Sequence, residues 1–183
     1  MARGREDLEE TYKTIGRDPQ AWLALAQELK MSAEAIYPHL ENALSLPPSF
    51  PGIQEKRFAY IHSYMLLNGL AFENVLKGIF IGRDPALATR EKISRGILTR
   101  GGHGIADGAR RILTLTDSQI GLLKRIEEYL VWAGRYPLPL TSDAYKNSEE
   151  QQSRSYHSKD RDSINRLFDR LAAVLQQEWQ ARP

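Results

Sequence analysis

The chain has 183 residues and a mass of 20.8 kDa, which is enough for one domain with a sizeable core. Its 25 basic and 23 acidic residues nearly cancel, so the composition alone does not indicate nucleic-acid binding, and any basic surface must be local. The chain has no cysteine, which excludes disulfides, cysteine metal sites and a thiol nucleophile. Because the first residues also lack the apolar segment of a signal peptide, we expect a cytoplasmic protein.

A short polar helix is predicted for residues 5–15, ending at Gly16. Its apolar residues recur at helical spacing and form a single narrow stripe, which consists of Leu8, Tyr12 and Ile15. Because this stripe offers little surface for burial, we expect residues 1–18 to be a peripheral segment.

A long amphipathic helix is predicted to begin at Asp18-Pro19, which supplies an N-cap and a first-turn proline, and to run to about Tyr37. Pro38 should end or kink this helix, because a proline has no backbone N–H to donate and crowds the preceding turn. Residues 39–44 would then extend it by another turn or two. The proline-rich stretch at 46–52 makes the first firm break.

The most apolar stretch, residues 58–81, predicts the central helix of the domain. Its apolar residues lie on both faces, so we expect other elements to pack on both sides. Polar and charged side chains near its middle argue against a membrane span. Gly69 lowers helix stability and is therefore expected to mark the close approach of a neighbouring helix or of a partner chain.

Glu73 and Lys77 are the two fully charged residues of this stretch, and they are four positions apart with the acid first, the order that favours an intrahelical pair. An apolar neighbourhood makes an unpaired charge expensive. One interpretation is a structural ion pair whose charged ends reach solvent. The other is that both residues line a ligand cleft, in which Arg135 balances Glu73.

The segment from residue 83 to residue 111 has seven basic residues against three acidic ones, which makes it the best candidate for an anion-binding surface. The basic residues are Arg83, Arg90, Lys92, Arg95, Arg100, Arg110 and Arg111. Two short helices are expected within residues 86–113, divided by a glycine cluster at 100–104. His103 lies in this cluster, either as a helix cap or loop residue or beside backbone amides that hold a phosphate.

The remaining chain predicts two more helices. Residues 116–119 have the form of a capping box and begin a helix that ends at Gly134. Residues 141–162 are polar with few apolar anchors, so we expect an exposed connector there. A last amphipathic helix follows at 164–179. The sequence therefore predicts one all-α domain over residues 1–183, an up-and-down bundle of four or five main helices with short accessory helices.

Arg57 and His62, at the start of the central helix, form a candidate catalytic pair. Histidine can transfer protons and arginine can neutralise a pentavalent phosphate, the two functions that metal-independent RNA cleavage requires. Their separation places the two side chains about 140° apart around a helix, so ordinary packing is the competing interpretation. The four histidines have no metal-ligand spacing and no nucleotide-binding loop is present, so we expect no metal and no cofactor.

Three motifs in a fixed order carry a family resemblance: LNGLAFENVLKGI at 67–79, GHGI at 102–105 and WAGRYP at 132–137. Together they resemble prokaryotic members of the HEPN (higher eukaryotes and prokaryotes nucleotide-binding) superfamily, over about residues 19–180. The resemblance implies a helical bundle, frequent dimerisation and roles in toxin–antitoxin, phage-defence or RNA-processing systems, where active members are ribonucleases. Their Arg-x4–6-His motif usually lies late in the bundle, whereas Arg57 and His62 lie early here.

Three hypotheses about function follow. The first is a HEPN-like homodimer that has lost catalysis and binds RNA or a nucleotide-containing ligand. Its cleft is expected to comprise Glu73, Lys77, His103, Arg135 and Tyr136. The second is an active, metal-independent ribonuclease in which Arg57 stabilises phosphate and His62 is the general acid or base, with the site completed across a dimer. The third is a protein-interaction module with no nucleic-acid role. An antitoxin-like protein partner is a further expectation, and no membrane association is expected.

Overall fold

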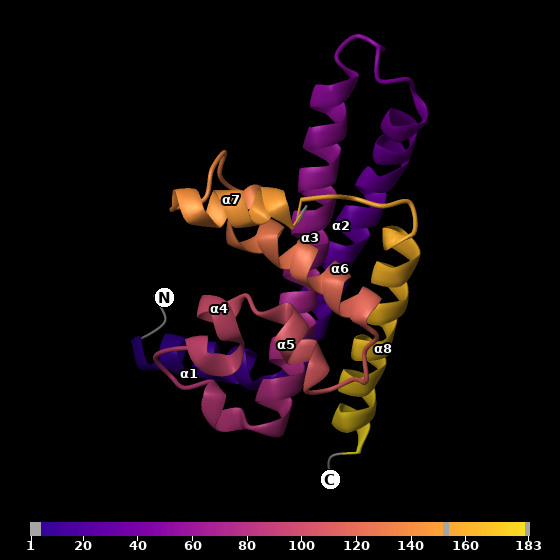
Figure 1. Ribbon diagram of the computed structural model, residues 1–183. Coiled ribbons are helices and arrows are strands. Elements are labelled where there is room, and N and C mark those ends of the chain that lie inside the picture. The colour runs from indigo at the N-terminus through magenta and orange to yellow at the C-terminus, as the bar shows by residue number, and fades with distance from the viewer. Residues whose placement is uncertain (1–4, 152–153, 182–183) are drawn as a thin grey trace.

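A computed structural model describes residues 5–151 and 154–181, and in this part of the chain it is helical without strands (Figure 1). Two isolated bridges, Ala88 with Ile93 and Thr99 with Gly104, are the only β pairings described there. The helices are α1 (Arg5–Arg17), α2 (Pro19–Ser45), α3 (Ile53–Arg83), η1 (Pro85–Leu87), η2 (Arg95–Ile97), α4 (Thr99–Gly102), α5 (Ile105–Arg110), α6 (Asp117–Glu128), η3 (Tyr129–Ala133), α7 (Ser142–Glu150) and α8 (Asp160–Gln180). The predicted all-α fold class is confirmed.

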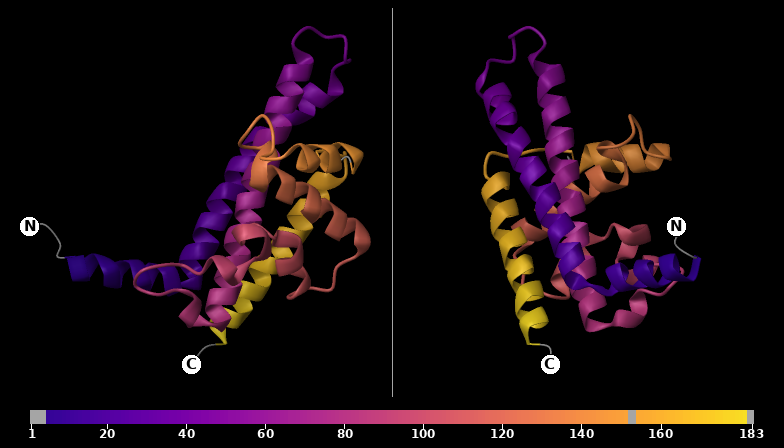
Figure 2. Two further views of the ribbon diagram at one scale, coloured as in Figure 1. Left: turned by 60° about the vertical axis from the view of Figure 1, so that its left-hand side comes forward. Right: turned by 180° about the vertical axis from the view of Figure 1, so that it is seen from behind.

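The helices α2 and α3 form a long antiparallel hairpin, and α8 packs along it (Figures 1 and 2). The outer end of the hairpin extends beyond the rest of the molecule. The helix α6 and the segment η3 lie across α3, and α5 packs beneath them. The helix α1 projects sideways from the base of α2, which agrees with the predicted peripheral position of this segment (Figure 2).

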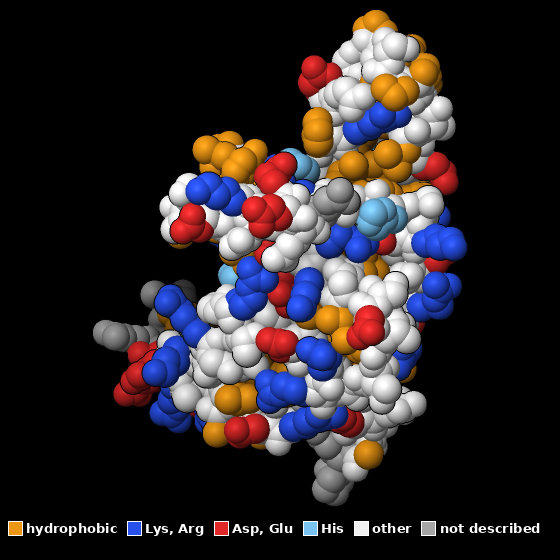
Figure 3. Space-filling model, viewed as in Figure 1, with side chains coloured by type: hydrophobic (Ala, Val, Ile, Leu, Met, Phe, Trp, Pro, Cys, Tyr) orange, Lys and Arg blue, Asp and Glu red, His pale blue; other side chains and the backbone are white. Residues whose placement is uncertain are grey.

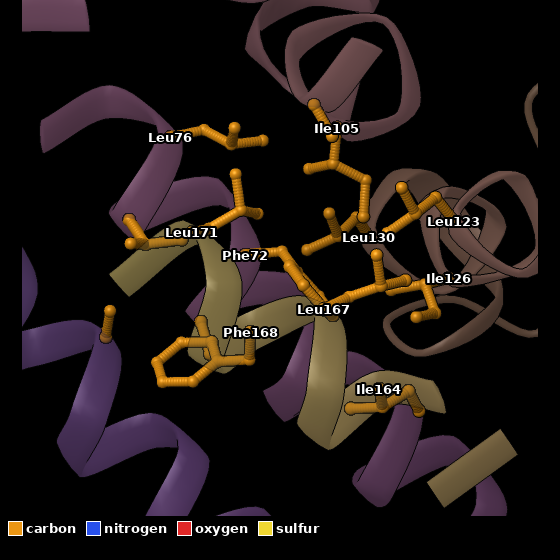
Figure 4. Close-up of a cluster of buried hydrophobic side chains, with 14 of the residues drawn as sticks. Phe72, Leu76, Ile105, Leu123, Ile126, Leu130, Ile164, Leu167, Phe168 and Leu171 are labelled. Carbon is orange, nitrogen blue, oxygen red and sulfur yellow. The ribbon is translucent and has the colours of Figure 1, made fainter. Parts of the chain in front are cut away.

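The helix α3 is the central element that the sequence predicts. Its buried side chains meet those of α2, α5, α6, η3 and α8 in one apolar cluster. Figure 4 shows part of this cluster, in which Phe72 and Leu76 of α3 meet Ile105 of α5, Leu130 of η3 and Leu167 of α8. The apolar residues on both faces of α3 are therefore explained by packing on both sides.

Membrane insertion offers a second explanation for a helix as long and apolar as α3. In the described part of the chain it is the one helix whose length and composition would suit a membrane span, and 67% of its most apolar window is buried inside the protein. Burial of this extent is what a helix at the centre of a packed bundle requires.

The helix α2 continues through Pro38 to Ser45, which agrees with the expected extension over residues 39–44, and Leu40 and Ala43 beyond the proline are buried. One sequence-based expectation is wrong. The region predicted as a connector contains the helix α7, whose N-cap Thr141 accepts a hydrogen bond from the Ala144 N–H at 3.2 Å. The expected exposure of this region is correct, since Ser148 is the one buried residue of α7.

The C-terminal helix begins earlier than predicted, at Asp160. The Asp160 carboxylate accepts hydrogen bonds from Arg125 of α6 at 2.6 Å and from the His157 N–H at 2.8 Å. The first turn of α8 is thus tied to α6 by a charge-assisted bond that the apolar periodicity of the sequence does not reveal.

Gly69 occupies the closest crossing of α3 and η3, as its sequence position predicts. A Cβ added there would lie 2.7 Å from Cγ of Leu130 and 3.1 Å from Cγ2 of Ile126. We expect Gly69→Ala to lower the free energy of unfolding by about 1–3 kcal/mol because it overpacks this crossing. The measurement is urea unfolding followed by circular dichroism.

Gly121 of α6 provides the matched control, because a Cβ added there meets nothing within 4 Å. Gly121→Ala should raise the free energy of unfolding by about 0.5–1 kcal/mol through helix propensity alone. Equal stability of Gly69→Ala and the unmodified protein would contradict the close crossing.

Candidate functional site

Glu73 is buried with two partners, and neither is the predicted Arg135. It is 7% exposed, its carboxylate pairs with Lys77 one turn along α3, and its second oxygen lies 2.7 Å from Nδ1 of His103. His103 belongs to the turn between α4 and α5, so this contact fastens that turn to the central helix. The interpretation as a structural ion pair is supported, and the predicted Glu73–Arg135 pair is wrong.

Arg135 and Tyr136 lie together but apart from that pair. The Arg135 guanidinium lies 5.3 Å from the centre of the Tyr136 ring and makes long hydrogen bonds, at 3.4 Å, to the Leu130 carbonyl and the Tyr136 hydroxyl. No carboxylate of the described residues forms an ion pair with Arg135. This exposed cation is therefore available to an anionic ligand.

The start of α5, where the sequence suggested a phosphate concavity, is occupied by the protein's own carboxylate. Glu127 is 3% exposed and accepts hydrogen bonds from the Ala106 N–H at 2.7 Å and from Arg100 at 2.9 Å. Burial is the main cause that raises the pKa of Glu127. The glycine cluster shapes this turn, with positive φ angles at Gly101 and Gly102. The Ala106 N–H at the start of α5 therefore binds the protein's own carboxylate.

Arg57 is a helix-end cap. Its guanidinium donates to the carbonyls of Ala43 at 3.0 Å, Leu44 at 3.4 Å and Leu46 at 2.5 Å, at the point where α2 ends. These carbonyls would otherwise have no intrahelical partner. These contacts favour a structural role for Arg57 over the predicted phosphate-binding role beside His62.

Three of the seven basic residues between residues 83 and 111 form ion pairs. Arg83 pairs with Glu178 and Arg90 pairs with Glu10, while Arg100 pairs with Glu127 and Glu128. Arg111 lies over the Phe80 ring at 4.1 Å. Lys92, Arg95 and Arg110 are exposed and form no ion pair with another described residue, so part of the predicted basic surface remains open to solvent.

His62 opens onto a small surface hollow that combines cationic and aromatic side chains. The hollow has a volume of about 250 Å³ and is lined by His62, residues 132–137 and Arg154. None of the described residues that line it is acidic. The His62 ring contacts Tyr129 at 5.6 Å and Phe58 at 6.1 Å between ring centres. We call this hollow the His62 pocket.

Burial, and next the positive charge of Arg154, lower the pKa of His62 below its ordinary value of 6.5. The imidazole is thus neutral at pH 7 and can accept a proton. Arg154 is held over Trp132 at 5.3 Å and over Tyr145 of α7 at 5.6 Å, and it also pairs with Glu149. Two aromatic rings therefore position the cation that faces His62.

A larger cleft of about 810 Å³ lies between α6 and α7 and adjoins the His62 pocket. Both hollows share Trp132, Arg135 and Tyr136 as lining residues. On the face shown in Figure 3, Lys and Arg side chains gather below α7, over α4, α5 and α6. No group of three or more His, Asp or Glu side chains that could hold a metal ion occurs within 5–151 and 154–181.

The shared wall of the two hollows depends on a π-helical turn. The Gly134 N–H donates to the Tyr129 carbonyl five residues earlier, at 3.1 Å, so η3 is wider than an α-helix. Sequence reasoning found Arg135 and Tyr136 through the motif that ends this helix. It missed Trp132 as a lining residue, and it missed Arg154, which lies in the region predicted as a connector. The Thr141 N-cap was the signal that could have revealed α7.

Comparison of the chain with models of protein families, with curated proteins and with solved structures gives no match. The resemblance to the HEPN superfamily therefore remains a prediction from the three sequence motifs.

A double-mutant cycle tests the partner of Glu73. Glu73→Ala should lower the free energy of unfolding by about 3 kcal/mol, because it leaves Lys77 and His103 without their partner. Coupling between Glu73→Ala and His103→Ala should exceed about 0.5 kcal/mol, whereas Glu73→Ala and Arg135→Ala should be additive within that value. Urea unfolding at pH 7 measures all four states of each cycle. Coupling to Arg135 without coupling to His103 would refute the observed pairing.

Proposed function

We propose that this protein binds RNA, or another nucleotide-containing ligand, at the His62 pocket. The observation that carries the proposal is the presence of His62, Arg135 and Arg154 around one hollow whose described lining contains no carboxylate. Phosphate contacts from basic side chains dominate the affinity of proteins for nucleic acids. Arg135 is suited to this role because no carboxylate of the described residues pairs with it.

Exposed aromatic rings next to these cations support an unpaired strand as the ligand. Tyr136 is 52% exposed beside Arg135, and Phe58 is 61% exposed one turn from His62. Bases stack on such rings whatever their sequence, and each stacked base contributes about 1–3 kcal/mol. Arginines for phosphates and rings for bases are the combination that single-stranded nucleic acids require.

The biological setting of the proposal comes from the family resemblance. We infer a cytoplasmic role in a toxin–antitoxin, phage-defence or RNA-processing system, with a homodimer as the working form and an antitoxin-like protein as a partner. A pocket with the chemistry to bind RNA phosphates is consistent with each of these systems.

Binding is tested by fluorescence anisotropy with a labelled single-stranded RNA of mixed sequence. Arg135→Gln should weaken binding to all sequences and reduce the slope of log affinity against log salt by about 0.7, the value for one lost phosphate contact to a single strand. Phe58→Ala should weaken binding about 5-fold or more and leave this slope unchanged, because stacking is not electrostatic.

Arg166, an exposed arginine of α8, provides the matched control. Arg166→Gln should leave affinity and salt slope as in the unmodified protein. Absence of RNA binding by the unmodified protein at low salt would refute the proposal and favour a protein-interaction module.

A metal-independent ribonuclease is the second candidate function, and the position of His62 favours it. His62 is neutral at pH 7 and lies in one pocket with Arg135 and Arg154. In this arrangement His62 would take the proton of a 2′-hydroxyl, and the 2′-oxygen would attack phosphorus and break its bond to the 5′-oxygen, which leaves with a proton from water. One of these two arginines would neutralise the phosphate, the role that the sequence suggested for Arg57.

Cleavage of labelled single-stranded RNA in EDTA tests this second candidate. His62→Gln should abolish cleavage, whereas Arg57→Ala should lower thermal stability and leave cleavage unchanged well below the unfolding temperature. The rate should fall as the pH decreases through a pKa below 6.5, because only neutral His62 accepts a proton. No cleavage by the unmodified protein would end the ribonuclease interpretation and leave the binding proposal intact.

A further inference from the structure

The cleft between α6 and α7 offers more room than the His62 pocket. Its volume of about 810 Å³ lies within the range of about 300–1,000 Å³ that is usual for ligand-binding clefts, whereas the His62 pocket has about 250 Å³. The two hollows meet at Trp132, Arg135 and Tyr136. A ligand bound beside His62 can therefore continue into the cleft.

Two cations of this cleft have no carboxylate partner among the described residues. Lys124 of α6 and Arg135, which follows η3, are both exposed and both line the cleft. Residue 135 lies 11 positions after residue 124, which corresponds to about 16 Å along a helix. Two phosphates of one strand that are about five nucleotides apart match this separation, at a stacked spacing of about 3.4 Å per nucleotide. The charges of the cleft therefore suit a strand longer than one nucleotide.

The carboxylates of the cleft do not neutralise these two cations. Glu127 and Glu128 both pair with Arg100. Asp107 accepts a hydrogen bond from the Thr99 hydroxyl at 3.0 Å and forms no ion pair with a described residue. Its negative charge disfavours a phosphate beside α5, whereas its remaining lone pairs can accept a hydrogen bond from the amino group of a base. We therefore expect bases, and not phosphates, beside α5.

The helix α7 presents two amide side chains to the cleft. Asn147 and Gln151 are one turn apart, both are exposed and both line the cleft. Neither side chain forms a hydrogen bond with another described residue. An amide offers a donor and an acceptor side by side, the pattern that matches the edge of adenine in a bidentate pair. Sequence-specific recognition of RNA usually uses the edges of unpaired bases, so these two side chains are suited to read one.

We propose that the cleft binds an adenine-containing single strand of RNA, about five nucleotides long, that enters from the His62 pocket. One phosphate contacts Arg135 and another contacts Lys124, and an adenine between them is bound by the amides of α7. Uracil suits the cleft less well, because it has no amino group to donate to Asp107. This inference rests on the proposed function and narrows its ligand from any nucleotide to a strand.

Fluorescence anisotropy with labelled oligoadenylates of one to about ten nucleotides tests the length of the site. Affinity should rise up to about five nucleotides and then level off. Lys124→Gln should reduce the slope of log affinity against log salt by about 0.7 for the pentamer and leave binding of the dinucleotide unchanged. Lys146→Gln is the matched control, because Lys146 is an exposed lysine of α7 that does not line the cleft. Binding of AMP as tight as that of the pentamer would overturn the proposal.

A comparison of oligoadenylate with oligouridylate of equal length tests the reading of a base. The unmodified protein should bind the adenylate about 5-fold or more tightly, the lower end of what one bidentate pair discriminates. The double variant Asn147→Ala/Gln151→Ala should lose this preference and keep the salt slope, whereas Lys124→Gln should keep the preference. Equal binding of both oligomers by the unmodified protein would overturn the proposal.

Failure of this inference and failure of the proposed function give different results. If Arg135→Gln weakens binding while Lys124→Gln and the double variant bind every oligomer as the unmodified protein does, the inference about the cleft is overturned and the proposal for the His62 pocket stands. If the unmodified protein binds no RNA at low salt, both are overturned.

Discussion

Because α3 is buried on both faces, Glu73 lies where an unpaired negative charge would strongly destabilise the fold. Lys77 of the same helix pairs with this carboxylate, and so does His103 of the turn that precedes α5. The second contact matters more for the architecture, because it attaches residues 99–110 to the bundle. Glu127 then holds the same segment from α6 through Ala106 and Arg100. Two buried carboxylates thus position this stretch together with its buried apolar residues Ile105, Ala106 and Ala109.

Patterns of burial explain what the sequence could predict. The sequence shows apolar periodicity in α2, α6 and α8 and a nearly continuous apolar run in α3. The capping box at Thr116 is present in the structure as the sequence indicates. The end of α2 was not predictable from Pro38 alone, because packing of Leu40 and Ala43 outweighs the local cost of a proline. The helix α7 has almost no buried face, so apolar periodicity gave no sign of it.

The candidate site was only partly predictable for a different reason. A helical wheel tells which side chains share a face, but it does not tell at which height and angle two helices cross. Glu73 was therefore correctly expected to need a partner, and Arg135 was the wrong one. In the same way the sequence indicated His62 as a site residue but not its neighbour Arg154, which lies more than ninety positions further along the chain. Arg57 was predicted as the partner of His62 because the two are close in the sequence, whereas in the structure it caps the end of α2.

The wide turn at η3 sets the direction in which the residues after it point. A π-helical turn contains one residue more than a regular turn, so everything after it is rotated by about 100° relative to an uninterrupted helix. Removing one residue between Tyr129 and Ala133 would swing Arg135 and Tyr136 away from His62 while leaving α6 intact. One residue in this turn thus decides whether Arg135 and Tyr136 lie beside His62.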